Sequence, residues 1–243
     1  MLVSVVLPCL NESRTLAGCI ESAQRAIKRM GVKGEVIVAD NGSHDGSSQI
    51  ASMMGAKVVI QPKGGYGNAC RAGMDVAKGK FILLADSDGT YDLEEIWKLV
   101  EILKKGYDLV LGSRLRGQME KGSMPFLHRY VGTPALNVLM RLLFGVKVSD
   151  SQSGMRGIRR EAYRRLSLSA EGMEFASEML IKAVVMGMRI GEVPIRYRRR
   201  EGGESKLRTF RDGWRHLRLM VNWWFKGYRN FSKIRNFKSG ERG

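Results

Sequence analysis

Two aspartates, Asp86 and Asp88, directly follow an apolar segment and could bind one metal ion together. The continuous apolar run 81–85 is typical of a buried strand. At the end of a strand, a small twist of the turn brings carboxylates at alternate positions to one hard cation. A ligand-free turn built from Asp and Gly would contain the same residues. The pair alone therefore leaves a metal site and an ordinary turn equally open.

Polar loops follow two earlier apolar segments as well. Asn11 and Glu12 come after the first segment, which Pro8 ends, and Asp40 comes directly after the second. In an open parallel sheet, loops at the carboxyl ends of the strands converge on one edge, where ligands bind. Ordinary turns have no reason to produce such a cluster of acidic loops. We therefore favour a functional site over three independent turns.

Strand and helix patterns alternate along the first 111 residues. The expected strands are 3–8, 35–39, 57–60, 81–85 and 107–111, and the expected helices are 13–30, 47–54, 64–77 and 93–105. The strands are continuously apolar rather than alternating, which is typical of a mostly parallel sheet covered on both faces. The fold class is therefore α/β, with helices on both faces of the sheet.

The pattern is less regular after residue 111. Residues 115–134 are rich in Gly, Pro and basic side chains, which favours a mobile loop, and 135–144 has the apolar stripe of a helix. Further strands are expected at 146–158 and 189–196, on either side of a helix that begins near Phe175. The sheet thus continues beyond this loop.

The composition indicates one sizeable core and an anionic partner. The chain has 243 residues, 44% of them hydrophobic, and 41 Lys and Arg against 24 Asp and Glu, which gives a net charge of +17. Such a charge favours nucleic acid, anionic lipid headgroups or phosphorylated substrates. The three cysteines have no CxxC spacing, which indicates neither disulfides nor a zinc site. We see no signal peptide and no membrane-spanning run, so we expect a cytosolic chain that touches a membrane at its surface.

The C-terminal segment combines aromatic and basic residues at helical spacing. The apolar positions that form one stripe are Phe210, Trp214, Leu217, Val221, Trp224, Tyr228 and Phe231. A basic helix with a Trp-bearing apolar face binds in the bilayer interface. A helix packed on the core and a basic RNA-binding tail are the alternatives. We expect a catalytic domain at 1–206 and an amphipathic membrane-interface tail at 207–243.

Seven short motifs occur in order along residues 3–207. They are Pro8 with Asn11-Glu12, Asp40 in Asp-Asn-Gly-Ser, Gly65-Tyr-Gly-Asn-Ala69, Asp86-Ser-Asp88, Asp150-Ser-Gln-Ser-Gly-Met-Arg156, Glu174-Phe-Ala-Ser-Glu178 and Gly203-Glu-Ser-Lys206. In this order and spacing the chain resembles an inverting family 2 glycosyltransferase with the Rossmann-like GT-A fold. Within that family it resembles the polyprenyl-phosphate or dolichyl-phosphate hexose synthases.

This resemblance implies a donor site and a metal. The residues that it assigns to a nucleotide sugar, of the GDP-mannose or UDP-glucose type, are Pro8, Asn11, Glu12, Asp40, Gly65 and Asp86. Asp86 and Asp88, with Gln152, would hold Mg²⁺ or Mn²⁺, which neutralises the charge on the departing nucleoside diphosphate. Asn41 is a departure, because many relatives have a second Asp at that position.

The resemblance also implies a polyprenyl or dolichyl phosphate acceptor on the cytoplasmic face of a membrane. The phosphate oxygen is already an anion and can attack without a general base, so the protein needs only to bind and orient it. Cations suited to this task, or to a solvated basic face, are Arg114, Arg129, Arg200 and Lys206, with Ser205 beside the last. Arg114 would also act in catalysis with Asp88 and Gln152. An enzyme with a saccharide or protein acceptor and a basic nucleic-acid-binding protein are the alternatives, although we expect no nucleic acid.

Overall fold

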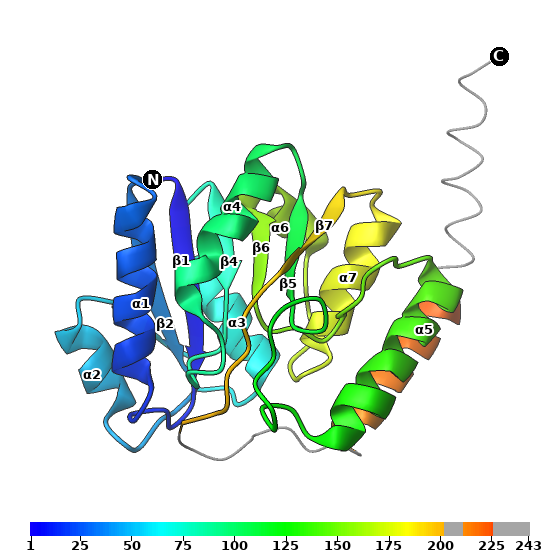
Figure 1. Ribbon diagram of the computed structural model, residues 1–243, viewed down its shortest axis with the longest axis horizontal. Helices are drawn as coiled ribbons and strands as arrows, with labels where there is room; N and C mark the ends of the chain where they lie inside the picture. Colours follow the sequence, from blue (N-terminus) through cyan, green and yellow to red (C-terminus); the bar gives the residue numbers. More distant parts are fainter. Residues whose placement is uncertain (202–210, 226–243) are drawn as a thin grey trace.

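A seven-stranded sheet forms the centre of the computed structural model, which describes residues 1–201 and 211–225 (Figure 1). The strands are β1 (Val3–Cys9), β2 (Gly34–Asp40), β3 (Lys57–Ile60), β4 (Phe81–Leu84), β5 (Leu109–Ser113), β6 (Arg156–Arg159) and β7 (Ile190–Pro194). Their order across the sheet is β3-β2-β1-β4-β6-β5-β7. Neighbouring strands are parallel except at β6, which is antiparallel to both β4 and β5. The expected mostly parallel α/β sheet is confirmed.

The expected strand 146–158 is wrong in its extent. Only Arg156–Arg159 of the expected strand 146–158 is extended in the sheet, and the residues before it form a loop. Because β6 is antiparallel, its first residue, Arg156, pairs with Leu84, the last residue of β4. The loop that precedes β6 therefore lies at the edge of the sheet where Asp86 and Asp88 follow β4.

Helices cover both faces of the sheet. One layer contains α1 (Leu16–Arg29), α2 (Ser47–Met53), the 3₁₀ turn η1 (Leu93–Glu95) and α4 (Ile96–Lys104). The other contains α3 (Tyr66–Asp75), α5 (Thr133–Phe144), α6 (Arg160–Leu166) and α7 (Phe175–Val185). Alternate residues of β1 serve the two layers, since Val5 packs in the first and Val6 in the second. Burial on both sides is the reason why the strands are continuously apolar.

Two further differences concern the irregular half of the chain. Helix α6 was not expected, and the segment expected to be a loop up to residue 134 becomes helical earlier, with the π-helical turn η2 (His128–Gly132) leading into α5. The helix follows Pro125, and Pro134 stands in its first turn, where a missing N–H costs no hydrogen bond. Proline in this segment therefore marks a helix start rather than a loop.

Residues 211–225 form a helix with two different faces. Asp212, His216 and Met220 are buried, and Met220 belongs to the core cluster that also contains residues of α5 and α7. Within the predicted stripe, the residues on the exposed side are Trp214, Leu217, Val221 and Trp224, which are 37–67% exposed. The stripe residues Phe210, Tyr228 and Phe231 lie outside the described residues, as do Ser205 and Lys206. One face thus packs on the core while the predicted stripe faces outward.

Within the described part of the chain, no helix combines the length and apolarity that crossing a bilayer requires.

Candidate functional site

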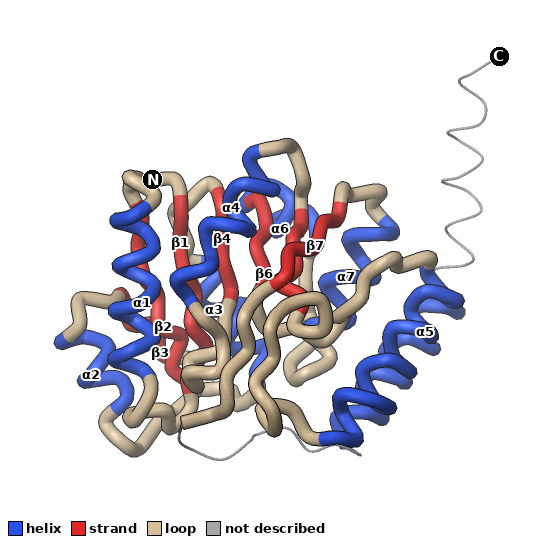
Figure 2. Tube along the Cα trace, in the orientation of Figure 1, coloured by secondary structure: helices blue, strands red, loops and turns tan. Residues whose placement is uncertain are grey.

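The loops that follow the parallel strands gather at one edge of the sheet, at the bottom of Figure 2. Asp86 and Asp88 lie in the loop after β4. Asp88 is 5% exposed, and its Oδ1 accepts hydrogen bonds from the backbone N–H (3.0 Å) and the hydroxyl (2.6 Å) of Thr90. These bonds hold the carboxylate in one orientation and leave Oδ2 for a cation.

Asp86 lies beside Asp88 in a crowded environment. The hydroxyl of Tyr66 at the start of α3 donates to Asp86 Oδ1 over 2.9 Å. A Cβ at Gly154, in the loop before β6, would lie 2.4 Å from Asp86 Oδ2, so only glycine lets the two loops approach this closely. Burial and the charge of Asp88 raise the pKa of Asp86. A cation at this place would reverse that effect.

Arg200 brings the first and fourth strand-end loops together. Its Nη1 is 3.1 Å from Glu12 Oε1 and its Nη2 is 2.5 Å from Asp88 Oδ2. Glu12, in the loop after β1, is 7% exposed. Two carboxylates that are far apart in the sequence therefore face the same position, which the guanidinium of Arg200 occupies. The expected convergence of these loops is seen in the structure.

The loop after β2 joins the same cluster through serine residues. Asp40 is 3% exposed and accepts hydrogen bonds from the hydroxyls of Ser43 and Ser48. The Ser43 hydroxyl also accepts from the backbone N–H of Asn11 over 2.9 Å. Asn11 has a φ of 55°, and its Oδ1 accepts from the N–H of His44. The loops after β1 and β2 are thus held as one unit.

Pro8 and Gly65 are the remaining residues that the sequence leads us to expect on the donor side. The carbonyl of Pro8 accepts from the hydroxyl of Ser87, between the two aspartates, over 2.7 Å. Gly65 has a φ of 132°, and a Cβ there would lie 2.3 Å from the carbonyl oxygen of Glu171. The glycine thus permits contact between two backbones. The six residues lie in the last two residues of β1 and β2, in the loops after β1 and β4, or directly before α3.

Asn41 performs a task that aspartate could not. Its Oδ1 accepts from the N–H of Gly65 over 2.7 Å, while its Nδ2 donates to the carbonyls of Gln61 and Lys63 over 2.9 Å each. A carboxylate has no hydrogens to donate at neutral pH. The amide therefore ties the loop after β3 to the loop after β2, a role that its position in the sequence did not indicate.

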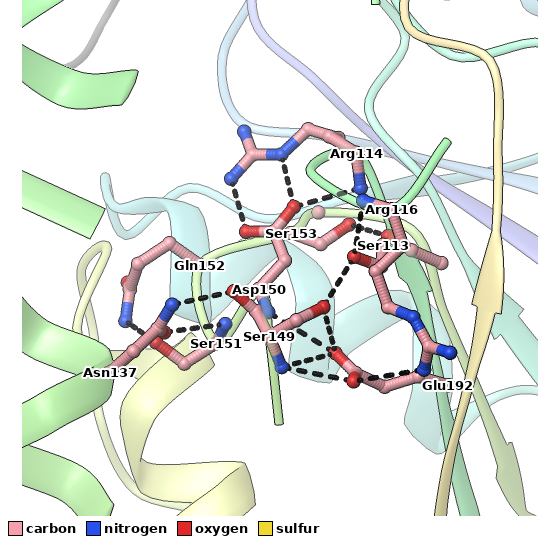
Figure 3. A network of polar contacts seen from close by, with 12 residues as sticks. Ser113, Arg114, Arg116, Asn137, Ser149, Asp150, Ser151, Gln152, Ser153 and Glu192 are labelled. Carbon is pink, nitrogen blue, oxygen red and sulfur yellow. Dashed lines mark hydrogen bonds and ion pairs between the residues drawn. The ribbon is translucent and has the colours of Figure 1, made fainter. Parts of the chain in front are cut away.

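Arg114 forms a buried ion pair with Asp150 (Figure 3). Its Nε and Nη2 lie 2.8 Å from the two carboxylate oxygens, and its backbone N–H is 2.9 Å from Oδ2. Arg114 is 8% exposed and Asp150 is fully buried. This fork binds the end of β5 to the loop 149–153. The remaining nitrogen, Nη1, donates to none of the described residues.

Several long-range partners hold the same loop. Glu192 of β7 accepts from the backbone N–H groups of Ser149 and Asp150, and Asn137 of α5 contacts the backbone of Ser149 and Ser151 (Figure 3). From the other side, the buried guanidinium of Arg156 donates to the carbonyls of Ser151, Ser153 and Ala176. Sequence reasoning missed Glu192 and Asn137 because neither belongs to a motif. The loop is therefore rigidly placed beside the acidic pair.

Gln152 stands in this loop. Its Nε2 lies 3.0 Å from the hydroxyl of Ser151 and 3.3 Å from that of Ser177 in α7. Arg129 lies farther out, in η2, with its guanidinium 5.3 Å from the ring centroid of Tyr130. The structure thus brings Gln152 and Arg200 to the edge that carries Asp86 and Asp88, and leaves Arg129 on the surface beside α5.

The acidic pair fits a hard divalent cation. Carboxylate and amide oxygens are the ligands that Mg²⁺ and Mn²⁺ prefer. The raised pKa of Asp86 and the pairing of Asp88 with Arg200 both show a site in which negative charge requires compensation. Within residues 1–201 and 211–225, no group of three or more His, Cys, Asp and Glu side chains could hold an ion.

Residues 4–167 match the model of the family described as "Glycosyl transferase family 2". "Low-salt glycan biosynthesis hexosyltransferase Agl6" of Haloferax volcanii is 45% identical over 221 residues, which are 90% of this chain and 53% of that protein. The chain therefore spans about half the length of this relative. "Dolichyl-phosphate hexose transferase" of the same organism is 34% identical over 87% of this chain and 89% of its own length.

A solved structure of glucosyl-3-phosphoglycerate synthase from Mycobacterium tuberculosis, in complex with Mn²⁺ and UDP-glucose, is also similar. It is 25% identical, with a TM-score of 0.69, over 92% of this chain and 78% of that chain. The complex of the same enzyme with Mn²⁺, UDP and glucosyl-3-phosphoglycerate has a TM-score of 0.70 over 92% of this chain and 79% of that chain. The family match, these relatives and the sheet topology all indicate the same family and fold. This chain belongs to glycosyltransferase family 2, has the GT-A fold and is a glycosyltransferase.

Proposed function

We propose that this protein transfers a hexose from a nucleotide sugar to a polyprenyl or dolichyl phosphate at the cytoplasmic face of a membrane, with inversion and with Mg²⁺ or Mn²⁺. The observation that carries the proposal is the convergence of Glu12 and Asp88 on one cation, Arg200, at the edge where the parallel strands end. Ligands of open α/β sheets bind at this edge. The relative named "Dolichyl-phosphate hexose transferase" supports the choice of acceptor.

The donor would bind in the loops after β1 and β2. Glu12 and Asp40 offer carboxylate oxygens to the N–H groups of the base and the hydroxyls of the ribose. Pro8, Asn11 and Gly65 would shape this pocket with their backbones. The bonds between Ser43 and both Asn11 and Asp40 preorganise it, so that little conformational entropy is lost on binding.

Asp86, Asp88 and Gln152 would hold the metal. When bound, the ion neutralises the diphosphate and thereby stabilises the leaving group. Tyr66 and Thr90 keep the two carboxylates in place by hydrogen bonds. The enzyme needs no general base for this acceptor, because a phosphate monoester is ionised at neutral pH.

Cations around this edge would bind the acceptor phosphate. Arg200 reaches the acidic pair, and Nη1 of Arg114 makes no hydrogen bond with the described residues, so each could donate to a phosphate oxygen. Arg129 lies beside exposed apolar side chains, where a lipid phosphate would meet the protein. Ser205 and Lys206 remain part of this proposal from the sequence alone.

An exposed apolar surface favours a lipid acceptor. Its members on the segment 126–142 are Phe126, Leu127, Tyr130, Val131, Val138 and Leu142, and those on the helix 211–225 are Trp214, Leu217, Val221, Trp224 and Phe225. Large exposed apolar patches mark interaction surfaces, and Trp with nearby Arg is typical of a bilayer interface. The acceptor-side cation Arg129 lies within the first of these segments.

A phosphorylated soluble acceptor is the second candidate. Solved structures 25–26% identical to this chain include a glucosyl-3-phosphoglycerate synthase with phosphoglyceric acid. Such an acceptor would use the same cations and would need no apolar surface. The exposed tryptophans therefore favour the lipid.

Transfer of radiolabel tests the proposal. The protein is mixed with labelled GDP-mannose or UDP-glucose, Mn²⁺ and either dolichyl phosphate in vesicles or 3-phosphoglycerate. We expect label in the organic extract from the vesicles and none on the soluble acceptor. Label on 3-phosphoglycerate alone would establish the second candidate, and absence of lipid label with every donor would refute the proposal.

A further inference from the structure

A chain of hydrogen bonds links Gln152 to the helix 211–225. Gln152 Nε2 is 3.3 Å from the hydroxyl oxygen of Ser177, and that oxygen is 2.6 Å from Nδ1 of His216. Ser177 is fully buried and His216 is 4% exposed. The three residues come from the loop before β6, from α7 and from the C-terminal helix. His216 therefore reaches the candidate site through one intervening side chain.

The protonation state of His216 sets the direction of this chain. Burial lowers the pKa of His216 to about 4, against the charge of Asp212 and with that of Arg156 and Arg215, so the ring is neutral near pH 7. If Nδ1 carries no hydrogen, the Ser177 hydroxyl must donate to it. Ser177 has one hydroxyl hydrogen, so its oxygen can then only accept from Gln152.

This direction, together with the Ser151 hydroxyl 3.0 Å from Nε2, determines which end of the Gln152 amide faces Ser177. Ser177 can accept only from the amide nitrogen, so Nε2 is turned toward Ser177 and Oε1 toward the other side. Gln152 Oε1 makes no hydrogen bond with any described residue. The close approach of Gly154 to Asp86 places this loop against the acidic pair. An amide oxygen is a ligand for a hard cation, whereas an amide nitrogen is not.

We propose that His216 is a positioning residue that, through Ser177, turns the amide oxygen of Gln152 toward the metal beside Asp86 and Asp88. This inference rests on the proposed function, because it requires the metal. The helix 211–225 must be docked for the contact to exist, since His216 lies on its buried face. Substitution of outer-shell residues of this kind commonly weakens metal affinity by about 10- to 100-fold.

Three variants separate this role from packing. In His216→Asn the side-chain Oδ1, one bond beyond Cγ like Nδ1 of histidine, can accept from Ser177, whereas His216→Leu fills space without an acceptor. Ser177→Ala removes the link and leaves His216 in place. Asn222→Ala, an exposed change on the same helix, is the control.

Mn²⁺ binding is measured by electron paramagnetic resonance of the free ion, with saturating GDP or UDP. We expect affinity about tenfold weaker in His216→Leu and Ser177→Ala. The His216→Asn and Asn222→Ala variants should bind Mn²⁺ with nearly wild-type affinity. The double variant His216→Leu with Ser177→Ala should bind Mn²⁺ no more weakly than either single variant. Wild-type affinity in His216→Leu, or equal losses in His216→Asn and His216→Leu, would overturn the proposal, as would a wild-type protein that binds no Mn²⁺.

The tautomer of His216 gives a second readout that packing alone would not fix. In ¹⁵N-histidine-labelled protein, the signals of His216 are those absent from His216→Asn. We expect the neutral Nε2–H tautomer at pH 7, and the Nδ1–H tautomer would overturn the proposal. Wild-type protein that binds Mn²⁺ but transfers no hexose to lipid would refute the proposed function alone. Lipid transfer together with unchanged Mn²⁺ affinity in His216→Leu and Ser177→Ala would refute only the role of His216.

Discussion

The two sides of the site that we propose for the donor and for the acceptor are built in different ways. On the donor side, short loops directly follow β1, β2 and β4, and most hydrogen bonds of Asp40 and Asp88 come from residues two to eight positions away. On the acceptor side, the loop 149–153 is held by Arg114, Asn137 and Glu192, which are 36, 12 and 42 positions from the residues that they contact. Short-range hydrogen bonds thus orient the carboxylates of the first half, whose loops are then joined by contacts such as Asn11–Ser43, whereas long-range contacts hold the second half throughout.

The difference shows how a family can keep one reaction and vary its acceptor. The sheet places the strand-end loops at its carboxyl edge, and hydrogen bonds between these loops then fix them. The acceptor side depends on α5, α7, β7 and the helix 211–225, so a change in any one of them can move the loop 149–153. Four predictions break or sharpen this contrast.

Loss of the Arg114–Asp150 pair should have the largest effect. Asp150→Ala leaves a buried guanidinium without its partner, so we expect the free energy of unfolding to fall by about 3–5 kcal/mol. Urea denaturation measures it. Lys63→Ala, which breaks an exposed ion pair with Glu171 at the donor side, is the comparison and should cost less than about 1 kcal/mol. Similar losses in the two variants would contradict the contrast.

Asp88→Asn should affect activity and leave the fold intact. The change removes one charge from the metal site, and a metal supplies several kcal/mol of transition-state stabilisation, so hexose transfer should fall by about 10²- to 10³-fold. The melting temperature in the absence of metal should fall only slightly, because Asn can still accept from Thr90 and Glu12 still pairs with Arg200. Substantial residual transfer would show that Asp86 alone holds the ion.

Acid should weaken the acceptor side through His216. Its pKa is about 4 in the folded protein against 6.5 when unfolded, so the unfolded state binds the extra proton first as the pH falls. This residue therefore contributes no penalty above pH 6.5 and about 3 kcal/mol of destabilisation at pH 4. Denaturation of wild type and His216→Asn at pH 7 and pH 4 measures the difference. An equal loss in both would show that other groups cause the acid sensitivity.

The exposed tryptophans of the helix 211–225 should contribute to membrane binding and not to the transfer reaction itself. Replacing Trp214 by Ala removes a large side chain that is 67% exposed, so affinity for anionic lipid vesicles should fall by about tenfold, or about 1.4 kcal/mol. Transfer to a short-chain polyprenyl phosphate in detergent should not change. Trp97→Ala, on α4 in the opposite helix layer, is the control for vesicle sedimentation. Equal losses in both variants would refute a specific membrane face.

The sequence predicted that the loops after β1 and β4 converge, because local chemistry determines where they lie. Continuous apolar runs specify buried parallel strands, and an acidic residue directly after such a run must lie at the carboxyl edge. Asp86, Asp88 and Glu12 could therefore be assigned to one site before any coordinates were known. The family, the fold class and the enzyme type follow from the same motifs.

Other features depended on tertiary structure. The run 146–158 contains apolar residues compatible with a strand, and only the antiparallel pairing of β6 with β4 shows where the strand begins. Arg114 was expected to bind phosphate, yet most of its guanidinium is committed to Asp150. No local pattern in the sequence places His216 beside Ser177. A hydrogen bond between side chains 39 positions apart depends on how helices dock, which periodicity does not specify.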